Sequence, residues 1–357
     1  MLGRKTRVVA VASLLVAMTP LYAEAATAIG SGYMLTEEDF FAEIPKVITA
    51  SRLVQPINEA PAALTVIDSE MIEASGARNL SDIFRLVPGF MVGYWSGNQQ
   101  MVTYQGLGYA YVRQLQVIVD GRAVYIPSLG GVPWADIPLV VGEIKRIEIT
   151  RGPNAVSYGS NSFLAVINIV TKKADDIANV VVKREVGSSE TSDVEVHESF
   201  NTGKFKLRAT AARQYDEGFE AFNDYRDANI LNINSEYRED DGDRWGFYLG
   251  QSMSNQGRGG DTSLIDTARE VRTISNYQHV RWQSSQTKMG EWVFQGYRTY
   301  HSLEDEYTTD PIPFIAPSGV DINQTYASRR YDVELQNTVS PTAWLRLVWG
   351  GSYRQDR

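Results

Sequence analysis

The sequence predicts an exported protein with two folded parts, a compact α+β domain followed by a transmembrane antiparallel β-barrel. Three observations predict this arrangement. Residues 1–25 have the pattern of a secretory signal peptide, residues 61–175 mix short strand and helix signals, and residues 176–357 repeat segments in which apolar and polar side chains alternate. Residues 26–60 form a periplasmic N-terminal segment between the signal peptide and the α+β domain.

The N-terminus has the three parts of a signal peptide. Three basic residues precede an apolar run over residues 8–18, and a small-x-small cleavage site follows at residues 23–25. A membrane-anchoring helix would need about 20 apolar residues, and Pro20 and Glu24 interrupt this run. We therefore expect export and cleavage near residue 25. No other stretch reaches the length of a spanning helix, so membrane insertion must use strands.

Residues 61–175 carry two helix signals. Asp68 can cap a brief helix over residues 69–75, which Gly76 can end. Asn79 opens a second helix, whose apolar side chains fall at i, i+3, i+4 and i+7 before Pro88 stops it. Both helices are short, as expected in a domain of mixed composition.

The same region carries several strand signals. Asp120-Gly121 separates two β-rich runs and is typical of a primed hairpin turn. The strands we expect cover residues 64–67, 101–104, 117–119, 123–125, 144–150 and 165–171. A domain of about 110 residues is large enough to bury a core of its own.

The second half alternates with the period of a strand. In residues 204–211, Phe205, Leu207 and Ala209 share one face while charged side chains occupy the other, and residues 231–238, 245–253, 330–336 and 345–353 repeat the pattern. Soluble β-sandwich strands also alternate, but they average about five or six residues. They also have no need of Trp and Tyr at their ends, where membrane interfaces favour them. The pattern favours an outer-membrane barrel.

We count about nine such segments, an odd number, whereas bacterial single-chain barrels have even strand numbers. An open sheet in lipid would leave two edges of unpaired backbone groups, each costing several kcal/mol. The sequence therefore predicts the N-terminal part of a longer barrel, a truncated piece of the whole.

Composition excludes several kinds of site. The chain has no Cys and only three His, which are scattered, so we expect no metal site. Its net charge of −9 argues against nucleic-acid binding. No Ser/His/Asp or Cys/His arrangement is present, and no glycine run has the spacing of a nucleotide-binding loop. We expect neither catalysis nor a cofactor.

Three motifs, "NLSDIFRLVPGFMV", "VIVDGRAVYIP" and "IKRIEITRGPNAVSYGSNSFLAVINIVTKK", resemble the plug domain of TonB-dependent outer-membrane receptors. The resemblance covers about residues 43–173, in the family's order. It implies a plug folded inside a 22-stranded barrel, and TonB-powered uptake of a scarce solute, most often an iron–siderophore complex or cobalamin. The expected partners are TonB with its inner-membrane energising complex, a small-molecule solute such as a metal chelate, and outer-membrane lipid.

The stretch "EIPKVITASRL", residues 43–53, resembles the family's TonB box. An extended segment at the periplasmic mouth can add itself as a strand to another protein's sheet edge. The residues we expect to bind TonB are Pro45, Lys46, Val47, Ile48, Thr49 and Ala50. The alternative is a plain linker after a signal peptide.

One departure from the family concerns the contact between plug and barrel. The family usually carries an Arg-Gly pair before the hairpin, whereas this chain has Gln105-Gly106, which keeps hydrogen bonding but loses the charge. A weaker ionic lock predicts an easier shift of the plug. The candidate lock residues are Gln105, Arg113, Arg146, Glu148 and Arg151.

Aromatic residues near glycines suggest where a solute would bind. Loops of this composition suit stacking on a flat or aromatic ligand. The candidates are Tyr94, Trp95, Tyr109, Tyr111, Tyr125 and Trp134. Equally, these rings can simply pack against the barrel wall.

Three functional classes remain open. The first is an energised transporter, most often for iron–siderophore complexes, with cobalamin or another small molecule as the alternative. The second is a signalling receptor, which the short distance between residues 25 and 46 disfavours because that class adds a periplasmic domain. The third is a passive porin, a structural barrel, or a truncated fragment that transports nothing.

Overall fold

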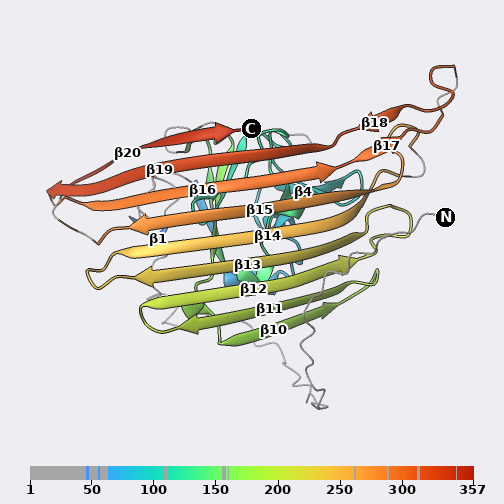
Figure 1. Cartoon of the computed structure of the whole chain (residues 1–357). Coiled ribbons are helices and arrows are strands. Elements are labelled where there is room, and N and C mark those ends of the chain that lie inside the picture. The colour runs from blue at the N-terminus through green and yellow to red at the C-terminus, as the bar shows by residue number, and fades with distance from the viewer. Residues whose placement is uncertain are drawn as a thin grey trace, which may run out of the picture. The chain divides into compact units, whose positions relative to one another are not determined.

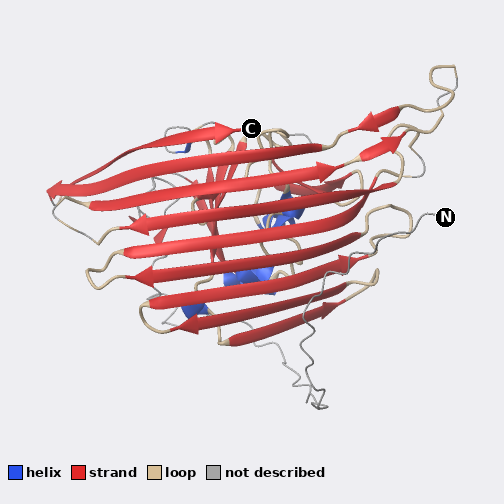
Figure 2. Ribbon diagram, viewed as in Figure 1, coloured by secondary structure: helices blue, strands red, loops and turns tan. Residues whose placement is uncertain are grey.

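Two sheets dominate the computed structural model, and the larger one curves around the smaller (Figures 1 and 2). The chain from Ile44 to Arg357 forms one compact unit. The structure describes residues 46–47, 55–56, 63–107, 111–154, 158–159, 161–260, 263–285, 287, 289–311, 314–342 and 344–357. Among these residues, no helix is long and apolar enough to cross a membrane.

The smaller sheet belongs to the plug. Its five strands are ordered β3-β8-β9-β6-β7, and all neighbours are antiparallel except β6 and β9, which run parallel. The strands are β3 (Ala63–Asp68), β6 (Leu115–Val119), β7 (Arg122–Ala123), β8 (Ile144–Arg151) and β9 (Ala165–Thr171). A separate hairpin consists of β4 (Phe90–Trp95) and β5 (Gln99–Tyr104).

The plug helices are short, and Figure 2 shows them gathered behind the large sheet. They are α2 (Ser69–Ala74), η2 (Leu80–Leu86), η3 (Trp134–Asp136), η4 (Val141–Glu143) and η5 (Ala174–Asp176). Asp68 caps α2 as predicted, because its carboxylate accepts from the backbone N–H of Met71 at 2.8 Å. The second predicted helix is the 3-10 helix η2, and the side chain of Asn79 makes no capping bond to it.

Most predicted strands of the plug are confirmed. Asp120 and Gly121 both have positive φ, 49° and 91°, as a primed turn between β6 and β7 requires. One expectation was wrong. Tyr94 and Trp95 were predicted in a loop, but they end strand β4, because the chain turns back only after them to pair with β5.

The plug has its own core. Ile67, Ile83, Ile147, Ile149 and Ile167 are all essentially inaccessible to solvent. Phe84 stacks on Phe90 and meets Trp134 edge-on, with ring centroids 5.7 and 5.1 Å apart. Burying each such side chain stabilises the fold by about 1.5–3 kcal/mol. These contacts give the plug a rigid body that other groups can hold or move as a unit.

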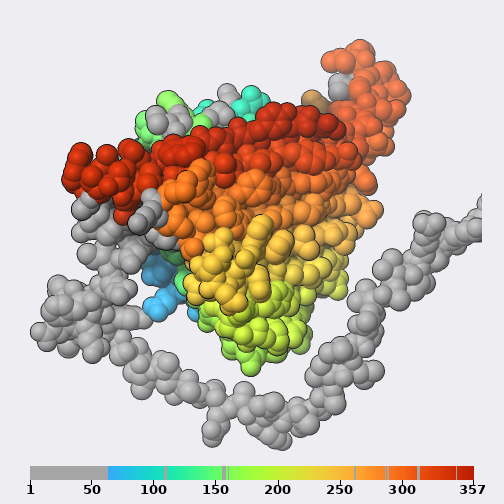
Figure 3. Space-filling model, turned by 60° about the vertical axis from the view of Figure 1, so that its left-hand side comes forward, coloured from blue at the N-terminus to red at the C-terminus, as the bar shows by residue number. Residues whose placement is uncertain are grey.

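The larger sheet has nine antiparallel strands, which confirms the count made from the sequence. In the space-filling view the strands follow one another in chain order from yellow-green to red (Figure 3). They are β10 (Val180–Val186), β11 (Ser192–Asn201), β12 (Phe205–Asp216), β13 (Arg226–Arg238), β14 (Arg244–Arg258), β15 (Arg269–Gln283), β16 (Glu291–Glu304), β19 (Tyr326–Thr342) and β20 (Leu345–Asp356).

The two faces of this sheet are inverted relative to a soluble protein. Apolar side chains such as Leu231, Phe247 and Leu335 are 41–49% exposed on the outer face. Polar side chains such as Arg208 and Gln256 are 1–2% exposed on the inner face, against the plug. A β-sandwich would bury the apolar face, whereas a barrel in lipid exposes it. The structure therefore decides between these two alternatives in favour of the barrel.

The connections differ at the two ends of the sheet. At one end most are long, and the longest, between β16 and β19, carries a hairpin of β17 (Glu306–Thr308) and β18 (Asp321–Asn323). At the other end they are short, as in residues 202–204 and 239–243. Outer-membrane barrels have short periplasmic turns and longer extracellular loops, which orients the sheet.

Aromatic side chains collect on the outer face near the short turns. Trp245 lies 6.3 Å from Trp282 between ring centroids, and Trp292 lies 5.1 Å from Trp349. Indole rings favour the boundary between lipid and water. This cluster marks the periplasmic interface, as the aromatic segment ends in the sequence predicted.

Candidate functional site: the interface between plug and sheet

Arg78 is the centre of a charged contact at the plug surface. Its guanidinium lies 2.5 Å from a carboxylate oxygen of Asp193 on β11 and 2.7 Å from one of Asp216 on β12, and it also donates to the carbonyl of Tyr215 at 3.0 Å. Burial alone would lower the pKa of Arg78, but the two carboxylates outweigh burial and raise it. This one side chain ties the plug to two neighbouring strands.

Glu143 and Arg208 form a second ion pair that is fully buried. Arg208 on β12 approaches Glu143 of η4 at 3.0 Å, and their side chains are 2% and 0% exposed. Arg208 also donates to the carbonyl of Lys172 at 2.6 Å, while Asn232 on β13 donates to Glu143 at 2.7 Å. A buried pair of this kind is costly to break because the remaining charge has no water to solvate it.

Asp136 on η3 makes a contact of a different type with the far strands. Its carboxylate accepts from Thr273 on β15 at 2.7 Å and lies 3.3 Å from the imidazole of His301 on β16. The other ring nitrogen of His301 is 3.1 Å from the Tyr326 hydroxyl. Burial by itself would raise the pKa of Asp136, but the hydrogen bond from His301 and its charge lower it overall.

Two glycines let the plug backbone touch the sheet. A Cβ on Gly142 would lie 2.6 Å from a carboxylate oxygen of Glu195. A Cβ on Gly97, whose φ is +86°, would lie 2.3 Å from the carbonyl oxygen of Gly257. Beside it, Asn98 donates to the carbonyl of Asp224 at 3.0 Å. The β4–β5 turn is thus docked on the long-loop end of the sheet.

The five predicted lock residues do not supply the ionic contacts just described. Arg146 pairs with Glu148 at 2.8 Å, and both residues belong to β8 of the plug. Arg113 is exposed, and Gln105 lies in a turn with φ of 55°. The lost charge at Gln105 therefore leaves the plug tied to the sheet by other pairs, those of Arg78 and Glu143, which no sequence motif had indicated.

The predicted solute-contacting residues separate into different environments. Trp134 is only 5% exposed and belongs to the plug core. Tyr94 and Trp95 are 47% and 59% exposed at the end of β4. Burial raises the pKa of Tyr111. Tyr109 lies outside the described residues.

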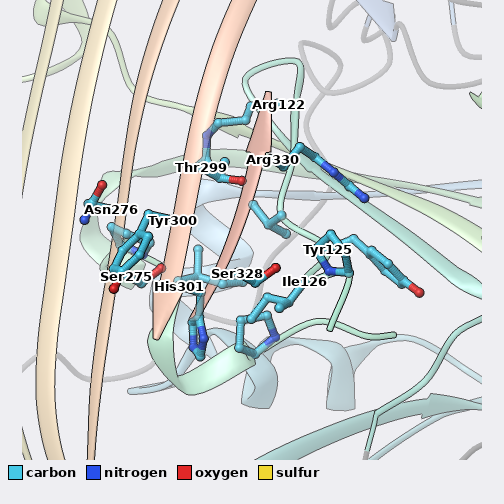
Figure 4. A pocket seen from close by; sticks show the side chains of 15 residues that line it. Arg122, Tyr125, Ile126, Ser275, Asn276, Thr299, Tyr300, His301, Ser328 and Arg330 are labelled. Carbon is cyan, nitrogen blue, oxygen red and sulfur yellow. The ribbon is translucent and has the colours of Figure 1, made fainter. Parts of the chain in front are cut away.

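Tyr125 borders a small cavity between plug and sheet, shown in Figure 4 with His301 and Arg330. The Arg330 guanidinium lies 5.5 Å from the ring centroid of Tyr125. The cavity measures about 30 Å³, far below the several hundred Å³ that a solute site occupies. Tyr125 therefore lies beside the sheet in this structure, and its contact with a solute stays a prediction.

The predicted TonB box is described in part. Lys46–Val47 form strand β1, which pairs antiparallel with β2 (Gln55–Pro56). Pro45, Ile48, Thr49 and Ala50 lie outside the described residues, as does the predicted signal peptide. The three His all lie buried on the inner, lumen-facing side of the sheet. In the described part of the chain, no group of three or more potential ligands could hold a metal ion.

A plug domain against the polar inner face of an antiparallel sheet, with an apolar outer face, defines a plugged outer-membrane barrel. Residues 56–166 match the family model "TonB-dependent Receptor Plug Domain". The chain therefore carries a plug domain of the TonB-dependent receptor type, followed by a sheet that resembles part of the barrel of such receptors.

Individual relatives agree with this family. The "Vitamin B12 transporter BtuB" of Vibrio vulnificus is 31% identical over 179 residues, which cover 49% of this chain and 28% of that protein. The "Iron-regulated outer membrane virulence protein" of Vibrio cholerae is 34% identical over 134 residues, covering 36% of this chain and 20% of that protein.

Solved structures share the fold at lower identity. The ferric yersiniabactin uptake receptor FyuA from Yersinia pestis superimposes with a TM-score of 0.65 at 20% identity, over 83% of this chain and 48% of that chain. The chain thus spans less than half the length of the relatives and structures just named.

Proposed function

We propose that the full-length protein imports an iron–siderophore complex across the bacterial outer membrane, powered by TonB and its inner-membrane energising complex. The observation that carries this proposal is a plug tied to the inner face of a barrel sheet by ion pairs, one of them fully buried. A plug in the lumen blocks passive diffusion, so transport requires that the plug be moved. The outer membrane has no ATP supply, so the force must arrive through contact with another protein.

Cobalamin is the alternative solute. The relative that is 31% identical is named a vitamin B12 transporter, and the relative that is 34% identical is named for its regulation by iron. Among structures of the same fold, FyuA takes up ferric yersiniabactin. A growth screen of the full-length protein against a panel of siderophores and vitamins separates the two solutes.

The box at residues 43–53 is our candidate for the TonB contact. Its strand β1 has only two residues and pairs with β2 of the same chain, so exchanging this short pairing for a strand of TonB would cost little. A location at the periplasmic mouth is what strand addition to TonB needs.

Deleting residues 46–50 from the full-length receptor tests energised transport. We expect uptake to stop while solute binding at the cell surface persists, because the barrel and the plug stay folded. Val47→Pro should have the same effect, since it removes a backbone donor from an added strand, whereas the matched Val47→Ala should leave uptake intact. Uptake that survives the deletion would favour a passive barrel instead.

A further inference from the structure

A larger cavity lies between the plug and strands β12–β15, and we call it the basic cavity. Its volume is about 370 Å³, which falls in the range of small-molecule sites. Seven of its lining side chains are Lys or Arg, and only two, Asp120 and Glu236, are carboxylates. Cations therefore outnumber carboxylates among its lining residues.

The basic cavity lies at the periplasmic end of the lumen. Lys206, Arg244 and Arg281 line it and lie within a few residues of short turns, at residues 202–204, 239–243 and 284–290. On the plug side it is lined by Lys172 and Lys173, which directly follow β9. A solute released past the plug would leave through this end.

Most of the cations in this wall are already paired. Lys145 lies 2.6 Å from Asp176, Lys173 lies 2.9 Å from Glu236, and three of the other five cations also pair with a carboxylate. The carboxylate of Asp120 accepts from the hydroxyl and N–H of Thr171 at 2.8 and 2.9 Å. These paired cations and Asp120 therefore stabilise the cavity wall through contacts with neighbouring side chains and backbone.

Arg244 and Arg281 are different, because within the described residues neither has a carboxylate partner. Gly246 on β14 pairs with Arg281 on β15, so the two arginines are diagonal neighbours on one face of the sheet. Arg238 on β13 stands directly opposite Arg244 on the same face. Like charges placed so close destabilise a sheet, and a bound anion would relieve that repulsion.

The acidic turn next to Arg244 is engaged elsewhere. The carboxylate of Glu239 accepts from the indole N–H of Trp245 at 2.7 Å, and that of Asp243 accepts from the indole N–H of Trp282 at 3.0 Å. Both indoles belong to the aromatic cluster on the outer face. These carboxylates thus point toward the membrane interface and leave the arginines of the lumen face uncompensated.

Tyr248 adds a neutral group beside the two arginines. A Cβ on Gly246 would lie 2.5 Å from the Tyr248 hydroxyl, so the absence of a side chain at Gly246 makes room for that hydroxyl. Guanidinium groups bind carboxylate and phosphate in a bidentate manner, and a phenol can donate a further hydrogen bond. Arg244, Arg281 and Tyr248 thus offer hydrogen-bond donors from three side chains to one cavity of suitable size.

We propose that the basic cavity binds a small polyanion bearing carboxylate or phosphate groups, and that it receives an anionic cargo on its way to the periplasm. The second part rests on the proposed transport function and names the charge class of its solute. A neutral solute would gain nothing from Arg244 and Arg281.

The binding test uses full-length receptor purified in detergent, titrated calorimetrically with inorganic pyrophosphate and, separately, with citrate. We expect both to bind the wild type, and Arg244→Gln/Arg281→Gln to weaken binding by at least about tenfold, since each lost charge-assisted contact accounts for about that factor. Tyr248→Phe should weaken it by about threefold, as for one neutral hydrogen bond. The matched control is Arg272→Gln/Arg329→Gln, which removes two exposed outer-face charges and should change nothing.

No binding to the wild type, or binding within twofold in the Arg244→Gln/Arg281→Gln variant, would overturn the site. The uptake arm separates its role from the proposed function. If deletion of residues 46–50 stops uptake but Arg244→Gln/Arg281→Gln leaves its rate unchanged, energised transport stands and the role in cargo exit fails. If that deletion leaves uptake intact, the transport proposal fails, while pyrophosphate binding still decides the site.

Discussion

The plug meets the sheet in two chemically different ways. Toward β11–β13 the contacts are ionic, with Arg78 on Asp193 and Asp216 and with Glu143 on Arg208. Toward β15 and β16, on the long-loop side, the contact is the hydrogen-bond network of Asp136. Near the short turns, the basic cavity lies between the plug and β12–β15. The plug is thus held by ion pairs on one side and mainly by hydrogen bonds and packing on the other, and we expect a pulling force to separate it first from β14–β16.

The largest effect is expected from Arg208→Met. It leaves Glu143 charged and fully buried, which should lower the free energy of unfolding of the plug by about 3–5 kcal/mol. Pulse proteolysis of full-length receptor in urea measures this. The double variant Glu143→Leu/Arg208→Met should recover most of the loss, because no charge is then stranded. A loss below about 1 kcal/mol in Arg208→Met would show that the ion pair of Glu143 and Arg208 does not hold the plug.

Arg78→Ala should cost less, about 2–3 kcal/mol in the same measurement. It removes hydrogen bonds between charged groups, but the side chain of Arg78 is 20% exposed and that of Asp216 is 15% exposed, so water compensates in part. Arg78→Lys keeps the charge without the fork that reaches two carboxylates, and an intermediate value is expected. Equal stability of Arg78→Lys and the wild type would show that the fork geometry has no role.

On the side of the plug that faces β15 and β16, Asp136 predicts that stability depends on pH. This change in stability should be smaller than that from breaking the buried ion pair. The pKa of Asp136 is lowered in the folded protein, so its contribution is present above the usual carboxyl pKa of about 4 and is lost as pH falls through the lower folded value. The stability difference between wild type and Asp136→Asn should therefore narrow below about pH 4. A difference that widens there would contradict this sign.

The smallest effect is expected at the rim of the side held by ion pairs. Lys206 pairs with Asp175 where both side chains are partly exposed to solvent. Exposed pairs contribute about 0–1 kcal/mol and weaken with salt. Lys206→Met should therefore change plug stability by less than about 1 kcal/mol, and the change should shrink further in 1 M salt. If Lys206→Met destabilised the plug as much as Arg78→Ala, the burial of an ion pair would not determine how much it stabilises the plug.

The sequence by itself determined the local features of this protein. The period-two alternation of segments such as residues 204–211 predicted nine strands, the Asp120-Gly121 pair predicted its turn, and Asp68 predicted a helix cap. Each of these signals depends on residues that are neighbours along the chain. Neighbouring residues largely determine backbone geometry and side-chain direction, so these patterns can be interpreted before the fold is known.

Only the tertiary structure decided which residues hold the plug. Arg78 and Asp193 are 115 positions apart, and Asp136 and His301 are 165 positions apart. Trp134, predicted to face a solute, lies in the core, and the unpaired Arg244 and Arg281 became visible only when β14 and β15 were brought into register. The residues next to a charged side chain do not identify its ion-pair partner, because ion pairing depends on distance in space and on burial, and folding sets both.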